Sequence, residues 1–474
     1  VLGTLNEVKQ VVADLRDGPL KAQGLGIEQS FDSGLFINRA VGLLTENLIV
    51  GALLALICVW WFMRDGRATL LIATSIPICL LATFVVLGSL VIVRLYVPAE
   101  FGVFSTWLGV VMTSAVLVTG RLEMALVIEA DGEPRRFAMA ATLATICLAA
   151  AVLFMLVLGA YLIVPASHHF TPGLVLAFLP TTLLIAAAQT WQSWAAAEGL
   201  YRGLSWMRIA QAVGVTSMQV LVGWLAPSAL GLALGHALGV LLGVVAAACM
   251  MPLSLRAFLP WVGFRKKLRA FWIQHRRFPL FALPADFTNT AAGQLPLFFI
   301  TSKFGSEASG FYALAVRILG GPISLLGTAV LDVFKRSAAT SYRELGHCRD
   351  DYLRTFRVLA VLGVVLALGV ILVAEPLFAW AFGETWRQAG VIAVWLMPMF
   401  ALRFVASPLS YVFYIAGVQR VDLAWQCGLL CITVLAFMGG LEFESSVKAY
   451  AAGYAGMYVI YLLLSYRYSK GSRA

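Results

Sequence analysis

The chain has 474 residues, of which 61% are hydrophobic and only 12% are charged, and its mean hydropathy is +0.88. Soluble domains carry about 25% charged residues, so this composition excludes a soluble globular protein. The net charge of +10 does not predict a nucleic-acid partner, because the basic residues fall in the connections between apolar stretches. The seven cysteines do not suggest a disulfide framework, since all but Cys348 lie inside those stretches.

Thirteen apolar stretches in the chain are long enough to cross a bilayer. A helix of about 20 residues spans about 30 Å, the thickness of the hydrocarbon core, whereas a membrane barrel would show shorter alternating segments. We therefore expect an all-α polytopic membrane protein with about 13 transmembrane helices. The predicted spans are 44–63, 69–93, 103–127, 137–164, 172–194, 207–225, 229–251, 278–302, 309–334, 355–380, 388–413, 421–441 and 447–466.

The distribution of lysine and arginine predicts how the chain crosses the membrane. One set of alternate connections carries most of the basic residues, including the dense group in 252–277, whereas the opposite loops after the second span hold only Arg94, Lys303, Arg387 and Lys448. Basic loops stay in the cytoplasm. This predicts a multi-pass protein with a cytoplasmic C-terminus and with residues 1–43 outside, which in a bacterium means the periplasm.

The basic cytoplasmic linker at 252–277 divides the last twelve spans into two six-helix bundles, at 69–251 and 278–474. The bundles also share a local pattern, because PAEFGVF at 98–104 aligns with SEASGFY at 306–312. Six spans preserve the direction of the chain, so this pattern predicts a parallel internal repeat. Transporters are commonly built from such repeats, with the substrate held between them.

The stretch RLYVPAEFGVFSTWLGVVMTSAVLVTGRLEMALVIEADGEPRR at 94–136 resembles the polysaccharide flippases of the multidrug/oligosaccharidyl-lipid/polysaccharide exporter superfamily. The stretch 295–334 is similar to the same family's seventh and eighth spans, and the resemblance covers about 88–474. It implies two six-helix bundles around a central cavity that work by alternating access. It also implies flipping of an undecaprenyl-pyrophosphate-linked oligosaccharide for cell-surface polysaccharide biosynthesis, with no cofactor and no enzymatic activity.

Residues 1–87 have a different resemblance. The FMRDGRATL turn and the Ile76-Pro77 pair are similar to the resistance-nodulation-division efflux pumps, so that 1–43 resembles a periplasmic fragment and 44–87 a transmembrane hairpin. The paired intramembrane aspartates of the next pump helix do not follow. We interpret the chain as a chimera with a junction at about 87–93; the alternative is a divergent flippase with one extra N-terminal helix.

Charged residues inside predicted spans are costly and are therefore candidates for function. Arg121, Arg317 and Arg403 are candidates for binding the pyrophosphate, because guanidinium groups engage phosphate oxygens in pairs and stay charged. The alternatives are a snorkelling pair of Arg121 with Glu123 at the interface and a structural ion pair of Arg317 with Asp286.

Pro284 and Pro296 interrupt the predicted span 278–302, and broken helices commonly line transporter cavities. Asn289 and Gln294 in this span are candidates for the cavity lining. Asp286 and Glu123 are candidates for coupling to a proton or sodium ion, and a salt bridge of Asp286 with an arginine is the alternative.

Other chemistries find little support. No G-x-x-x-x-G-K-[ST] loop or G-x-S-x-G motif occurs in the sequence. The His168-His169 pair lacks further ligands for a metal site. The basic run RKKLR at 265–269 predicts an interfacial helix that binds anionic membrane lipids. A multidrug–cation antiporter, or a spliced chain without function, remain the alternatives to a flippase.

Overall fold

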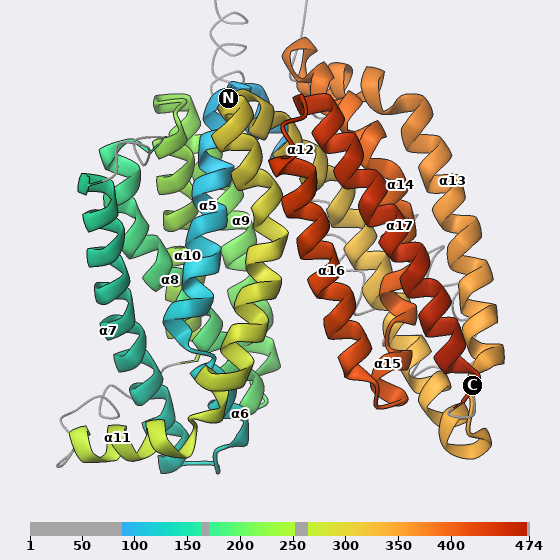
Figure 1. Ribbon diagram of the computed structural model, residues 1–474. Helices are drawn as coiled ribbons and strands as arrows, with labels where there is room; N and C mark the ends of the chain where they lie inside the picture. Colours follow the sequence, from blue (N-terminus) through green and yellow to red (C-terminus); the bar gives the residue numbers. More distant parts are fainter. Residues whose placement is uncertain (1–87, 164–169, 252–263, 472–474) are drawn as a thin grey trace, which may run out of the picture. The chain divides into compact units, whose positions relative to one another are not determined.

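A computed structural model describes residues 88–163, 170–251 and 264–471 (Figure 1). The regular structure in these ranges is helical throughout, which confirms the prediction of an all-α protein. The predicted span 44–63, most of 69–93, the periplasmic fragment 1–43 and the His168-His169 pair lie outside the described residues. Residues 88–95 are helical and lead into α5.

The helices follow one another with short connections. Before the basic linker they are α5 (Pro98–Thr119), the 3₁₀ turn η1 (Leu122–Met124), α6 (Ala125–Ile128), α7 (Glu133–Ile163), α8 (Pro172–Ala197), α9 (Tyr201–Leu225) and α10 (Ala229–Met250). From the linker onward they are α11 (Phe264–Gln274), the π-helical turn η4 (Phe278–Ala282), α12 (Leu283–Leu345), α13 (Arg349–Phe382), η5 (Glu384–Trp386), α14 (Arg387–Leu409), α15 (Val412–Ile415), α16 (Gln419–Met438) and α17 (Phe443–Ser469).

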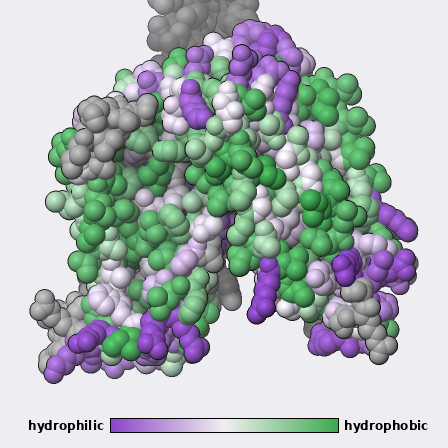
Figure 2. All heavy atoms as spheres, in the orientation of Figure 1, coloured by the Kyte–Doolittle hydropathy of each residue, from purple (hydrophilic) through white to green (hydrophobic). Residues whose placement is uncertain are grey.

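Eight of the described helices are long and apolar enough to cross a membrane. They differ in burial. In the most apolar stretch of α5, 61% is buried inside the protein, whereas in the corresponding stretch of α13 only 11% is buried. The exposed side chains of α13 are large and hydrophobic, such as Val365 and Leu372, so this helix faces lipid. Hydrophobic residues cover the middle of the face in Figure 2, and hydrophilic residues gather at its lower edge.

A glycine ridge on α10 packs against α9. Gly231, Gly235, Gly239 and Gly243 recur every four residues and therefore share one face of the helix. A Cβ atom at Gly239 would lie 2.2 Å from the Cα atom of Val215, and Gly235 and Gly243 meet α9 in the same way at Gln219 and Gln211. Small residues allow this close backbone approach, on which helix association in lipid depends.

A seam between α5 and α12 joins the two halves of the sequence. Gly102 and Gly310 touch backbone to backbone, because a Cβ atom at Gly102 would lie 1.8 Å from the Ser306 oxygen and one at Gly310 would lie 2.0 Å from the Pro98 oxygen. These glycines occupy the same position in the two copies of the repeated pattern, PAEFG and SEASG. Such reciprocal contact is expected of two repeats related by a two-fold axis.

From this contact the first part of α12 continues along α5 in the antiparallel direction. The Oγ1 atoms of Thr106 and Thr301 lie 2.6 Å apart, and the Gln294 side chain fills the space over Gly109. The later part of α12 packs against α14. Gly305, with φ 90° and ψ 172°, separates the two parts, and only glycine adopts this backbone conformation readily.

The RLY residues that precede α5 also connect distant elements. The Arg94 side chain donates hydrogen bonds to the Ala381 oxygen (2.8 Å) and the Trp380 oxygen (3.1 Å) at the end of α13. The Tyr96 hydroxyl donates to the Gln219 oxygen on α9 (2.9 Å). Both residues therefore hold the start of α5 in place.

Three predicted boundaries are wrong. The predicted span 103–127 ends early, because α5 stops at Thr119 and Gly120 turns the chain with φ 57°, so Arg121 and Glu123 lie in the following turn. The predicted loop between 302 and 309 is helical except at Gly305, and the predicted loop 335–354 is helical to Leu345. Polar residues such as Lys303 and Lys335 end an apolar pattern without ending a helix.

We expect the substitution Gly239→Ala to destabilise the α9–α10 pair, because the added methyl group meets backbone atoms that cannot move aside. Overpacking of this kind costs about 1–3 kcal/mol, and the melting temperature of the detergent-purified protein should fall. Gly369→Ala on α13 is the matched control, since nothing lies within 4 Å of its Cβ position. Equal melting temperatures for both variants would contradict the packing argument.

Candidate functional site

A cavity of about 550 Å³ is lined by both parts of α12 and by the helices α14, α16 and α17, all in the second half of the sequence. Its wall is mostly aromatic and polar, which is unusual for the interior of a membrane protein. The lining residues are Thr288, Asn289, Thr290, Ala292, Gly293, Gln294, Tyr312, Val316, Met399, Phe400, Arg403, Ser407, Ser410, Tyr414, Asp422, Trp425, Gln426, Leu429, Tyr450, Tyr454, Tyr458 and Tyr461. Three residues predicted from the sequence, Asn289, Gln294 and Arg403, are among them.

Arg403 on α14 is the cation of this cavity. Its side chain is exposed to the cavity and also borders a smaller pocket of about 150 Å³ against Gly320 and Gly327 of α12. No carboxylate forms an ion pair with it in the described part of the chain. An arginine at the centre of a transmembrane helix costs about 2.5–3.5 kcal/mol on insertion scales, so an unpaired one in a polar cavity is suited to an anionic ligand.

An aromatic wall lines the same cavity as Arg403 and consists of Trp425 of α16 with Tyr450, Tyr454, Tyr458 and Tyr461 of α17. The tyrosines recur at every third or fourth residue and therefore share one face of the helix. Trp425 stacks on Tyr461 with ring centroids 4.0 Å apart, and Tyr450 and Tyr454 are 4.3 Å apart. This wall was not predicted from the sequence, although the tyrosine spacing in AYAAGYAGMYVIYLL is a usable signal.

Asp422 at the start of α16 is the anion of the cavity and was also missed. Its side chain is 9% exposed, accepts a hydrogen bond from the Tyr461 hydroxyl and accepts another from Gln426 Nε2 at 3.0 Å. These two donors fix the orientation of the carboxylate. Its position at the edge of a predicted span gave no reason to separate it from an ordinary interfacial charge.

Arg121, Glu123 and Asp286 form an ion-pair cluster outside the cavity. Arg121 Nε lies 2.5 Å from Asp286 Oδ2, and Arg121 Nη1 lies 3.0 Å from Glu123 Oε1. The backbone of Arg121 has φ 58°, a left-handed conformation that residues other than glycine rarely adopt. Glu123 Oε2 is buried and has no hydrogen-bond partner among the described residues. The salt bridge foreseen for Asp286 is therefore made, but with Arg121 and not with Arg317.

Arg317 lies on the later part of α12, near His236 of α10. It forms no ion pair or hydrogen bond with another described residue and does not line the large cavity. The structure therefore does not gather the three predicted arginines in one place. Arg403 lies in the cavity, Arg121 in the ion-pair cluster and Arg317 on the side of α12 that approaches α10.

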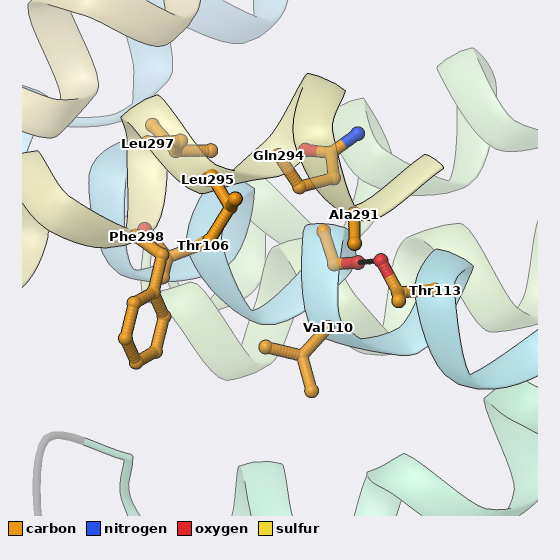
Figure 3. Close-up of a pocket in the computed structure, with 9 residues that line it drawn as sticks. Thr106, Val110, Thr113, Ala291, Gln294, Leu295, Leu297 and Phe298 are labelled. Atoms are coloured by element: carbon orange, nitrogen blue, oxygen red, sulfur yellow. Dashed lines mark hydrogen bonds between the residues drawn. The ribbon is translucent and has the colours of Figure 1, made fainter. Parts of the chain in front are cut away.

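Gln294 connects the cavity with the seam. Figure 3 shows it beside Ala291 on α12, opposite Thr113 and Val110 of α5, around a pocket of about 140 Å³. The same residue lines the large cavity. A ligand that bound Gln294 from the cavity would therefore contact the helix that packs along α5.

The basic helix α11 docks on the first half. Phe271 is buried and meets Phe137 edge-on, Trp272 Nε1 donates to Thr145 Oγ1 at 2.9 Å, and His275 Nε2 lies 2.7 Å from Glu129 Oε1. Lys266 remains exposed. Among the described residues, no group of three or more His, Cys, Asp and Glu side chains is arranged to hold a metal ion.

Comparison with known proteins shows what this architecture is similar to. The model of a family described as "Polysaccharide biosynthesis protein" matches residues 91–391. The teichuronic acid biosynthesis protein TuaB of Bacillus subtilis (strain 168) is 26% identical over 220 residues, which cover 44% of this chain and 45% of TuaB. The match thus spans about half of this curated relative.

Solved structures share the fold. The lipid II flippase MurJ in an inward closed conformation has a TM-score of 0.62 at 10% identity, covering 84% of this chain and 87% of that one. An inward-facing multidrug resistance MATE family transporter of the MOP superfamily has a TM-score of 0.60 at 12% identity, covering 81% and 93%. At these identities the likeness shows the fold alone.

A second family model, of the AcrB/AcrD/AcrF family, matches residues 1–179. It agrees with the efflux-pump resemblance of residues 1–87 and extends beyond them, so the two family matches overlap over 91–179. The first match covers more than half of the chain and begins at residue 91, and the solved structures extend over most of the chain. This chain belongs to the polysaccharide biosynthesis protein family.

Proposed function

We propose that the chain flips an undecaprenyl-pyrophosphate-linked oligosaccharide across the bacterial inner membrane by alternating access. Family membership places it in polysaccharide biosynthesis, and its fold is shared with a lipid II flippase. The observation that carries the proposal is Arg403, which has no ion-pair partner among the described residues and lines a polar cavity formed by helices of the second half. Flipping breaks no covalent bond, so the cavity needs binding groups and no catalytic ones.

Arg403 would bind the pyrophosphate. Its planar guanidinium donates paired hydrogen bonds to phosphate oxygens and keeps its charge in a membrane interior. Asn289 and Gln294 on the facing helix add neutral donors and acceptors to the same cavity. Arg121 already binds two carboxylates, so it would reach a phosphate only after Asp286 moves away. Arg317 does not line the large cavity, so it would bind a phosphate outside it.

The two ends of the seam would act as gates. With α5 running from the periplasm to the cytoplasm, as the basic loops predict, the Gly102–Gly310 contact closes the periplasmic end and the Arg121–Asp286 pair closes the cytoplasmic end. The first closure depends on backbone contact and opens only if the helices separate. The second depends on charge, so an ion or an anionic ligand can exchange for one partner. Asp286 and Glu123 would couple transport to a proton or sodium ion at this point.

A multidrug–cation antiporter is the second candidate. The aromatic wall and Asp422 favour it, because flat aromatic faces and a carboxylate also bind organic cations. Drug-stimulated cation flux in proteoliposomes, without transport of a sugar-linked lipid, would support this alternative over the flippase.

Under the proposed flippase function, the pump-like residues before the junction at 87–93 would contribute nothing to transport. Long sequencing reads across the codons for residues 80–95 test whether the chimera exists as a single gene. Reads in which the two parts never occur in one molecule would show that the join is artificial.

We expect Arg403→Ala to reduce complementation of a flippase-deficient strain by about 10- to 100-fold. This is the effect expected when one or two hydrogen bonds to a charged group are lost. Arg403→Lys should restore part of the activity, because it keeps the charge but not the paired donors. Arg387→Ala is the control, since Arg387 lies at the exposed start of α14 and pairs with Glu384 and Glu375. Full activity of Arg403→Ala at normal expression would rule out this phosphate site.

The ion-pair gate predicts that transport depends on the charge at position 286. Asp286→Arg should impair transport because it places two cations together, whereas Asp286→Glu should retain most of it because the carboxylate stays. The side chains of the pair are partly exposed, 24% for Arg121 and 34% for Asp286. Its contribution to the free energy of unfolding is therefore closer to that of a surface ion pair, about 1 kcal/mol, than to that of a buried pair, about 3–5 kcal/mol. Normal transport by Asp286→Arg, at normal expression, would contradict a charge-based gate.

A further inference from the structure

The cavity has two chemically different ends. Arg403 supplies a positive charge on α14, whereas Trp425, Tyr461 and Asp422 form an aromatic–carboxylate cluster on α16 and α17. Trp425 is half-buried and lies against Tyr461, and Tyr414, which is 54% exposed, borders the same end. The pyrophosphate uses the first end, so the second end is left for another part of the ligand.

The aromatic–carboxylate cluster matches the chemistry of a pyranose ring. A pyranose presents a face of C–H groups, which pack on aromatic rings, and an edge of hydroxyl donors. Asp422 is held by Tyr461 and Gln426 in a fixed orientation, and a carboxylate with two oxygens retains lone pairs for further hydroxyl donors. The Tyr458 hydroxyl lines the cavity and has no hydrogen-bond partner among the described residues, so it is free for a ligand.

The charges of the cavity select against an acidic sugar. Among the described lining residues, Arg403 is the cation and Asp422 the anion. With the pyrophosphate on Arg403, no basic group remains to neutralise a sugar carboxylate. Such a carboxylate would lie near Asp422, and like charges at short range in a site of low dielectric repel strongly.

We propose that the aromatic–carboxylate cluster of Trp425, Tyr461 and Asp422, with Tyr414 and Tyr458 beside it, is a sugar subsite that binds a neutral pyranose of the lipid-linked glycan. The proposal rests on the proposed flippase function and divides the headgroup between two ends of one cavity. Arg403 binds the pyrophosphate. The cluster strengthens binding of a lipid that carries a neutral sugar, relative to a lipid without sugar and to one with an acidic sugar.

Binding of three lipids to the full chain in detergent tests this subsite. The probes are undecaprenyl pyrophosphate alone, the same lipid carrying a neutral disaccharide of N-acetylglucosamine and galactose, and the same lipid carrying glucuronic acid. We expect the neutral disaccharide to bind at least about tenfold more tightly than the bare lipid, and the glucuronate lipid to show no such gain.

Variants assign the gain to the cluster. Trp425→Leu and Asp422→Asn should reduce the disaccharide's gain, taken relative to the bare lipid on the same variant, to less than about twofold. Arg403→Ala should weaken binding of all three lipids. The matched control is Tyr466→Leu, because Tyr466 lies on α17 outside the cavity and packs on Tyr352; it should retain the full gain. Size-exclusion profiles verify that each variant is folded.

Each outcome bears on a different claim. Binding of the bare lipid that depends on Arg403, with no gain from the disaccharide or a gain that survives Trp425→Leu and Asp422→Asn, overturns the sugar subsite and leaves the proposed function intact. A gain for the glucuronate lipid equal to that of the neutral one overturns the selectivity. Absence of binding for all three lipids overturns the proposed function, and the subsite with it.

Discussion

The backbone contact between Gly102 and Gly310 constrains the rest of the structure. It fixes where α5 meets α12, and from that point the two helices run antiparallel through Thr106 and Thr301 to Arg121 and Asp286. The break at Gly305 lets the later part of α12 leave this seam and pack on α14. The large cavity lies where the two parts of α12 diverge, so its position follows from the glycine contact.

The charges of the described helices fall into two groups with different consequences. Arg121, Asp286 and Glu123 neutralise one another at the seam, so they hold helices together and change state only when helices move. Arg403 has no ion-pair partner in the described part of the chain. A charge without a partner is costly in a membrane, and it persists where a ligand or water compensates it. Arg317 also lacks an ion pair, but only Arg403 lines the large cavity, so under the proposed function Arg403 is the stronger candidate for binding the ligand.

Hydropathy predicted the helical membrane fold, and the repeated pattern at 98–104 and 306–312 marked the two segments that touch, although the alignment alone did not say that they would. The boundaries near Arg121 and Gly305 were wrong, because a polar residue ends an apolar window whether or not the helix ends. The charges that pair, and the tyrosines of α17 that face a cavity, depend on tertiary packing, which a single sequence does not encode locally. Of the five residues predicted to line a cavity, Asn289, Gln294 and Arg403 line the large one; Arg121 and Arg317 are also polar residues in predicted spans, and only the packing of the helices separates them from the other three.

The size of the cavity limits which part of a lipid-linked substrate it can hold. About 550 Å³ is within the range of pockets for ligands of drug size, enough for a phosphate and sugars but not for a long polyprenyl chain. The apolar surface of outer helices such as α13 is in contact with lipid, where such a chain is already stable. Under the proposed function, the protein therefore compensates only the polar headgroup. This is where the energetic barrier to flipping lies, because moving unpaired polar and charged groups through hydrocarbon is what the bilayer opposes.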